Sequence, residues 1–168
     1  SDTHFYHEKI IEYANRPFKD IEEMNNALIN NWNKKVKPKD EVYILGDFSF
    51  GNKEQTLDLL DKLNGRKYLI KGNHDRIIKE EEVASRFEWI KDYYRLKYKK
   101  YKFVLFHYPL MIWDCQQYGA IHLYGHIHSG VVPLGQARMF NMSVERNNYE
   151  PVSIEEIIES RDKRIVGR

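Results

Sequence analysis

The sequence predicts a single domain of the α/β or α+β class with at least one mixed β-sheet. Short hydrophobic runs typical of buried strands alternate with segments whose apolar residues recur at helical spacing. The 168 residues, 42% of them hydrophobic, are enough for one ordinary globular core. Because no repeat, low-complexity segment or linker divides the chain, we expect residues 1–168 to form one domain.

Helices are predicted where a capping residue precedes an apolar stripe. Asp20 and Glu23 form a capping-box pattern before a helix whose apolar residues continue to Trp32. A second helix is expected over residues 52–63, and a charged, weakly patterned one over residues 77–87. Ser153 opens a last helix, in which the isoleucines that follow it share one side.

Strands are predicted over residues 42–45, 68–70, 121–124 and 138–144. Residues 94–98 alternate apolar and basic side chains and turn near Lys99 into another strand, a period-two pattern that indicates a hairpin. The hairpin also explains the lysine- and tyrosine-rich composition of this stretch better than a nucleic-acid-binding surface does.

Composition narrows the function classes. A net charge of +2 gives no strong attraction to nucleic acid or membranes, and no apolar run approaches the roughly 20 residues that span a bilayer. The single cysteine, Cys115, cannot form an internal disulfide and favours a reducing, cytoplasmic location. The first polar motif has no strand before it, unlike the others, so we expect a short strand to precede Ser1.

Polar clusters that follow hydrophobic runs contain side chains of the kinds that bind transition metals. The candidate ligands are Asp2, His4, Asp47, Asn73, His107, His126 and His128. They are too many for one ion with about four to six ligands, but two adjacent ions that share a carboxylate would use them all. The count therefore makes a two-metal hydrolase the first hypothesis.

The spacing of these residues suits a common site. In an extended chain, residues i and i+2 project to the same side, so Asp2 with His4 can face one small volume, as can His126 with His128. Glycines before several ligands allow a sharp turn and a close approach to an ion. Strand carboxyl ends are where open α/β sheets place their ligand sites, so ligands distant in sequence can converge there.

The chain resembles the calcineurin-like metallophosphoesterase superfamily, and within it the small bacterial and phage phosphoesterases, in five motifs that span residues 2–128. In order, these are Asp2-x-His4, Gly46-Asp47, Gly72-Asn73-His74-Asp75, His107 and Gly125-His126-x-His128. The resemblance implies a sandwich of two mixed β-sheets flanked by helices.

The resemblance also implies how the ligands are divided. It assigns one metal to Asp2, His4 and His128. It assigns the second metal to Asn73, His107 and His126, and it makes Asp47 the bridge between the two. Two divalent ions about 3.5–4 Å apart can clamp both oxygens of an in-line displacement, with a bridging hydroxide as nucleophile. Manganese is favoured, and iron, zinc and cobalt also accept such donors.

Further residues receive roles beside the metals. The family pattern makes His74 the general acid for the leaving oxygen, and Asp75 would hold its ring and favour the imidazolium. Arg76 directly follows this motif and is the leading candidate for a phosphate contact. His7 and Arg16 follow the first motif closely and are weaker candidates for the same role.

The expected activity is a metal-dependent phosphoesterase that acts on a small phosphoester or nucleotide-type substrate. A phosphodiester is favoured, because a compact chain has little room for a cap over the site. The alternatives are a phosphomonoesterase or a dinucleoside polyphosphate hydrolase, and then a non-catalytic scaffold of the same fold. The scaffold is disfavoured because every ligand and His74 are retained. The sequence specifies neither the physiological substrate nor an oligomeric state.

Overall fold

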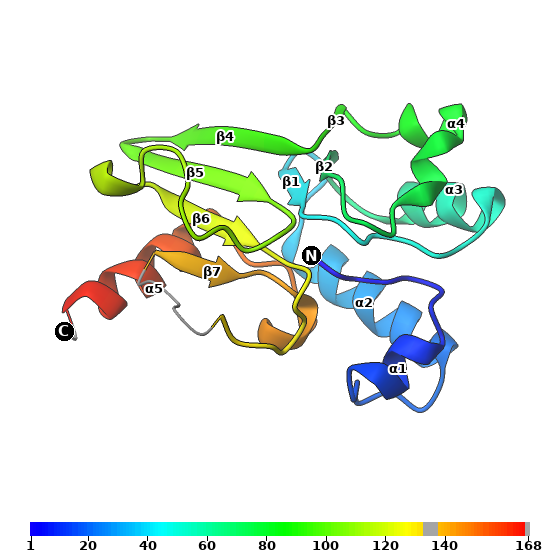
Figure 1. Ribbon diagram of the computed structural model, residues 1–168. Coiled ribbons are helices and arrows are strands. Elements are labelled where there is room, and N and C mark those ends of the chain that lie inside the picture. The colour runs from blue at the N-terminus through cyan, green and yellow to red at the C-terminus, as the bar shows by residue number, and fades with distance from the viewer. Residues whose placement is uncertain (133–137, 167–168) are drawn as a thin grey trace.

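The computed structural model describes residues 1–132 and 138–166 and has the predicted architecture of two β-sheets flanked by helices (Figure 1). One sheet is parallel with strand order β1-β2-β3; the other is mixed, with β4 antiparallel to β5 and β5-β6-β7 parallel. The strands are β1 (Glu41–Ile44), β2 (Arg66–Ile70), β3 (Trp89–Lys91), β4 (Tyr93–Tyr98), β5 (Tyr101–Phe106), β6 (Ile121–Tyr124) and β7 (Met139–Asn141).

The helices begin largely where capping residues predict. Asp20 accepts a hydrogen bond from Glu23 N before α2, and Asn52 forms a complete capping box before α3. Ser153 and Glu156 cap α5 reciprocally. The α-helices are α1 (Lys9–Tyr13), α2 (Ile21–Lys35), α3 (Lys53–Lys62), α4 (Glu81–Ala84) and α5 (Ile154–Val166), with 3₁₀ turns at Arg76–Lys79, Gln116–Tyr118 and Val144–Arg146.

Two parts of the chain differ from the sequence prediction. The single helix expected over residues 77–87 is a 3₁₀ turn followed by the short helix α4, because Glu80 between them has an extended backbone. That stretch is too charged to support a longer apolar stripe; Val83 and Phe87 are its buried hydrophobic residues. The strand expected over residues 138–144 ends at Asn141, and Val144 already begins a 3₁₀ turn. Strand β3 and helix α1 were not predicted.

Alternating side chains separate three layers of core. Leu69 of β2 packs with α2 and α3 on the outer face of the parallel sheet, while its neighbour Ile70 packs between the two sheets. Phe103 and Leu105 of β5 face the same inter-sheet core, and Val104 between them faces the outer side of the mixed sheet. The central strands are therefore apolar on both faces, as buried parallel strands usually are.

The N-terminal segment joins the two sheets. Asp2 N donates to Gly46 O and Phe5 N donates to Phe48 O, so the segment runs beside the chain that leaves β1. On its other side, Val144 N donates to Ser1 O, just beyond β7. Residues 1–5 are thus held between the carboxyl ends of a strand from each sheet.

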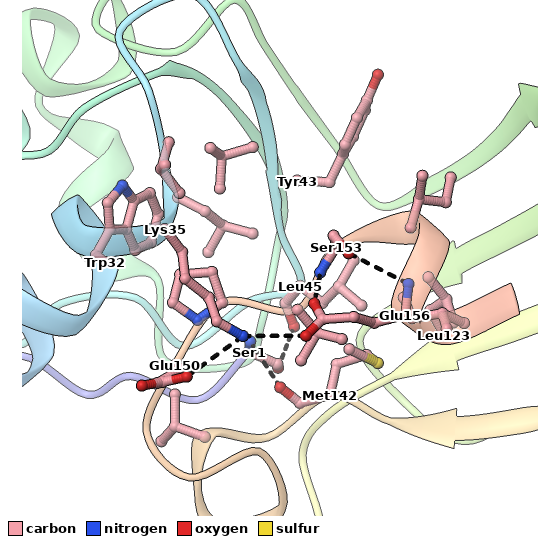
Figure 2. A pocket seen from close by; sticks show the side chains of 18 of the residues that line it. Ser1, Trp32, Lys35, Tyr43, Leu45, Leu123, Met142, Glu150, Ser153 and Glu156 are labelled. Atoms are coloured by element: carbon pink, nitrogen blue, oxygen red, sulfur yellow. Dashed lines mark hydrogen bonds and ion pairs between the residues drawn. The ribbon is translucent and has the colours of Figure 1, made fainter. Parts of the chain in front are cut away.

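A groove with a volume of about 710 Å³ opens between β1, the end of α2 and the chain that leads into α5 (Figure 2). Its lining is mostly apolar, and Lys35 lies across it in ion pairs with Glu150 (3.3 Å) and Glu156 (3.2 Å). Ser1 borders the groove. No helix in the described part of the chain is long and apolar enough to cross a membrane.

Replacing Leu69 by Ala tests the packing of the parallel sheet. Leu69 is fully buried, so the substitution should lower the free energy of unfolding by about 2–5 kcal/mol. Ile112→Ala is the matched control: its side chain is 77% exposed, and its effect should stay within about 0.5 kcal/mol. Equal effects in urea unfolding would contradict the layer assignment.

Candidate metal centre

The candidate ligands come together from the ends of strands and from the N-terminal segment. Asp47 follows β1, Asn73 follows β2, His107 follows β5, and His126 and His128 follow β6. Since β1 and β2 are parallel, as are β5 and β6, these carboxyl ends lie at the same edge of each sheet. Figure 1 shows the N-terminus beside this edge, where the segment adds Asp2 and His4.

The first donor group consists of Asp2, His4 and His128, whose ligand atoms lie within 4.8 Å of one another. Asp2 is fully buried and His4 nearly so. Both ring nitrogens of His4 are buried without a hydrogen-bond partner among the described residues, and Nε2 lies 4.0 Å from Asp2 Oδ1. A buried imidazole normally requires a hydrogen-bond partner. The unpartnered Nε2 of His4, which lies near the carboxylate of Asp2, therefore suits a divalent cation as its partner.

The second donor group consists of Asp47, His107 and His126, again with ligand atoms within 4.8 Å of one another. Asn73 joins them: its Oδ1 lies 3.1 Å from His107 Nε2 and 3.0 Å from His126 Nδ1. The other ring nitrogen of His107 contacts Leu45 O at 2.8 Å, which holds the ring and leaves Nε2 for the site.

Asp47 lies between the two groups. Its Oδ2 is 3.7 Å from His4 Nε2 of the first group and 3.6 Å from His107 Nε2 of the second. Its Oδ1 accepts a hydrogen bond from His74 N at 2.9 Å, which fixes the carboxylate. This is the position that a carboxylate shared by two cations needs.

Five of the seven donor residues have a strained backbone. Their φ angles are 56° for Asp2, 50° for His4, 54° for Asp47, 71° for His126 and 49° for His128. A left-handed conformation at a residue other than glycine costs on the order of 1–3 kcal/mol and persists only where the surroundings impose it. Strain repeated at these donors marks the locus as one shaped for a ligand.

Two glycines allow the chain segments to approach closely. A Cβ atom at Gly72 would lie 2.5 Å from Asp47 N, and one at Gly125 would lie 2.4 Å from Asp2 Oδ2. Contacts this short are not tolerated by any side chain, so both positions require glycine. The glycines predicted to bring backbone close to the site therefore do so.

Burial and neighbouring groups shift the pKa values of three donor histidines. Burial lowers the pKa of His4 to about 2, so its ring is neutral at physiological pH. Burial, and then the neighbouring His107, also lowers the pKa of His126. The pKa of His128 is instead raised, chiefly by its hydrogen bond to Glu145. Neutral imidazoles are the form that binds metals.

His74 lies at the edge of the donor groups and is exposed. Its ring centroid is 6.0 Å from that of His4 and 5.2 Å from that of Phe50. Asp75 does not take the role expected of it, as the partner of the His74 ring. Its carboxylate accepts hydrogen bonds from the backbone N–H groups of Gly72, Asp47 and Phe48 at 2.7, 2.9 and 2.8 Å, because these amides are otherwise buried without partners.

The candidate phosphate contacts differ in position. Arg16 is not available to substrate: its side chain is fully buried, and it donates to Glu145 and to the backbone of the first motif. His7 lies next to the site, stacked on Phe50 with ring centroids 4.1 Å apart. Arg76 is exposed at the start of a 3₁₀ turn directly after His74 and Asp75.

Two polar residues at the site were not predicted. Ser143 Oγ donates to Asp2 Oδ2 at 2.8 Å, and Glu145 Oε1 lies 2.9 Å from His128 Nδ1. Both follow β7 in the structure; Glu145 also follows the strand expected over residues 138–144, whereas Ser143 was hidden inside that expected strand. His122, within β6, is structural: its ring is fully buried and contacts Val104 O and Tyr108 O.

Comparison with known proteins identifies the family. The calcineurin-like phosphoesterase superfamily domain matches residues 1–141. An uncharacterized protein of Methanocaldococcus jannaschii is 38% identical over 100% of this chain and 92% of its own length. The gene 66 protein of Mycobacterium phage D29 is 32% identical over 79% of this chain and 78% of its own. The crystal structure of a protein of unknown function from Aquifex aeolicus is similar with a TM-score of 0.73 and 32% identity, covering 94% of this chain and 95% of that chain.

The fold and the donor groups are those of a metal-dependent phosphoesterase, and the chain belongs to the calcineurin-like phosphoesterase superfamily. This membership makes it a hydrolase of phosphoric esters that uses divalent metal ions. The resemblance inferred from five motifs is thereby confirmed.

Replacing Asp47 by Asn tests the metal centre. Mn²⁺ should raise the melting temperature of the wild-type protein, because it binds only the folded state. Asp47→Asn should remove most of that shift, since it withdraws a carboxylate that lies 3.7 and 3.6 Å from one donor in each group. Asp92→Asn, at an exposed ion pair with Lys71, should leave the shift unchanged. A full shift in Asp47→Asn would contradict the assignment.

Proposed function

We propose that this protein is a phosphodiesterase whose site holds two divalent cations bridged by Asp47. The observation that carries the proposal is the position of Asp47 Oδ2, nearly equidistant from a histidine of each donor group at 3.7 and 3.6 Å. In this assignment Asp2, His4 and His128 hold one cation, and Asn73, His107 and His126 hold the other.

Divalent cations bound there would lower the pKa of a coordinated water and stabilise negative charge on the phosphoryl oxygens. The protein's own residues supply position and charge. The carboxylates of Asp2 and Asp47 are buried, so they balance much of the cationic charge in a region of low solvent access. Ser143 and the His126 amide donate to Asp2, and the His74 amide donates to Asp47, so neither carboxylate is free to rotate.

His74 is assigned as the general acid for the leaving oxygen. Its backbone is fixed to Asp47 Oδ1, which places its exposed ring beside the donor groups without using it as a ligand. Because Asp75 is occupied by backbone amides, it acts on the loop that carries His74 and not on the ring itself. The imidazole is therefore open to substrate and solvent.

The charge near the site supports a diester over a monoester. A phosphodiester carries one negative charge, whereas a phosphomonoester approaches two at neutral pH. Of the two arginines considered as phosphate contacts, Arg16 is buried in an internal ion pair, and Arg76 remains. Asn73, His74 and Arg76 are all exposed, so a substrate with two organic groups has room to bind.

Substrate class is tested by comparing bis-p-nitrophenyl phosphate with p-nitrophenyl phosphate in Mn²⁺. We expect a higher kcat/KM for the diester, because Arg16 is buried in an internal ion pair and a singly charged diester needs less cationic compensation than a monoester. A dinucleoside polyphosphate is the third substrate in the series. A clear preference for the monoester or the polyphosphate would replace the diester assignment and leave the metal assignment intact.

Replacing His74 by Ala tests the general acid. Turnover of an alkyl diester, whose leaving group needs a proton, should fall by on the order of 10²–10⁴. Turnover of a p-nitrophenyl ester should fall much less, because that leaving group departs as a stable anion. Mn²⁺ content measured by elemental analysis serves as the control and should stay at the wild-type value. Equal losses on the two esters would remove His74 from this role.

A further inference from the structure

Arg16, Glu145 and His128 lie far apart in the sequence but form a network of ion pairs and hydrogen bonds beside the first donor group. Glu145 Oε1 accepts hydrogen bonds from Arg16 Nη2 at 2.7 Å and Nε at 3.0 Å. The same oxygen lies 2.9 Å from Nδ1 of His128. The side chains of Arg16 and Glu145 are 0% and 4% exposed, while that of His128 is 26% exposed. The network therefore extends from the buried side chain of Arg16 to His128 in the first donor group.

Arg16 also holds the other half of the first donor group. Its Nη2 donates to Asp2 O at 2.6 Å and its Nη1 donates to Thr3 O at 2.8 Å. These carbonyls belong to the segment in which Asp2 and His4 adopt left-handed backbones. One guanidinium thus fixes the backbone that carries two donors and, through Glu145, the ring of the third.

Glu145 is not fully satisfied by these contacts. Its Oε2 is buried and has no hydrogen-bond partner among the described residues. Burying a carboxylate with one unpaired oxygen is unfavourable in itself, which suggests that the negative charge of Glu145 has a role at this position. An ionised carboxylate only accepts hydrogen bonds, so it requires the proton of His128 to be on Nδ1. That tautomer leaves Nε2 as the nitrogen with a free lone pair.

We propose that Glu145, held by Arg16, is a positioning residue that fixes the tautomer and orientation of His128 as a ligand of the first cation. The inference rests on the proposed two-cation site and adds a residue outside the five motifs. A carboxylate behind a ligating histidine makes the imidazole a stronger donor, and its loss typically costs about 10–100-fold in metal affinity.

The test is Mn²⁺ titration of the variant Glu145→Gln, followed by electron paramagnetic resonance. Wild-type protein should bind two Mn²⁺ and show the spin-coupled signal of a neighbouring pair. Glu145→Gln keeps the shape of the side chain but not its charge. It should bind one Mn²⁺ with wild-type affinity and the other about 10–100-fold more weakly. At intermediate Mn²⁺ the coupled signal should give way to that of an isolated ion.

Two further variants separate positioning from folding. Glu82→Gln makes the same change in an exposed glutamate that pairs with Lys53, and it should leave both affinities unchanged. The double variant Arg16→Met with Glu145→Met removes the buried charges together, so no unpaired charge remains to unfold the protein. Its circular dichroism spectrum should show that it folds. As in Glu145→Gln, it should bind one Mn²⁺ with wild-type affinity and the other more weakly.

Each outcome decides the question. Folded Glu145→Gln and double variants with wild-type affinity for both ions would overturn the proposal. Failure of both variants to fold would assign the pair to stability alone and would overturn it equally. If wild-type protein itself binds fewer than two Mn²⁺, the two-cation site fails independently of Glu145.

Discussion

The metal centre depends on the hydrogen bonds that hold residues 1–5 between the two sheets. Asp2 N donates to Gly46 O on the side of the parallel sheet, and Val144 N donates to Ser1 O on the side of the mixed sheet. Without this segment, the strand ends would present Asp47 in one sheet and the histidines after β5 and β6 in the other. With it, Asp2 and His4 complete the first donor group at the junction, so the packing of the two sheets sets the distance between the donor groups.

Without bound cations, the arrangement of this site lowers the stability of the fold. It collects left-handed backbones, buried carboxylates and a histidine whose two ring nitrogens lack hydrogen-bond partners in the described structure. The surrounding layers stabilise this arrangement, because both sheets bury apolar side chains on each face. Divalent cations would relieve the same unfavourable terms, since they neutralise Asp2 and Asp47 and give His4 a partner. Fold stability and metal affinity are therefore linked through the same few residues.

Two charged residues near the motifs, Asp75 and Arg16, bind buried groups of the protein and are not available to substrate. Asp75 binds three backbone amides around Gly72 and Asp47, and Arg16 binds the backbone of the first motif together with Glu145. In both cases a charge excluded from water is stabilised by several hydrogen bonds, as buried ions require. Their effect on chemistry is indirect: they fix the loops from which His74 and the metal donors project. Of the two arginines that follow the motifs, Arg16 is buried and Arg76 is exposed, which is consistent with a substrate of low charge.

The sequence by itself determined the family, the candidate donor residues and most of the elements, because these depend on local signals. Capping residues marked the start of α2 and α5, period-two alternation marked the hairpin, and polar residues after hydrophobic runs marked the donors. Only the tertiary structure decided which charged residues face inward. Arg16 and Asp75 stand beside motif residues in sequence, but burial and hydrogen-bond partners depend on segments up to 129 positions away, as in the Arg16–Glu145 pair. No local pattern encodes such a partner, since it exists only once the two sheets have packed.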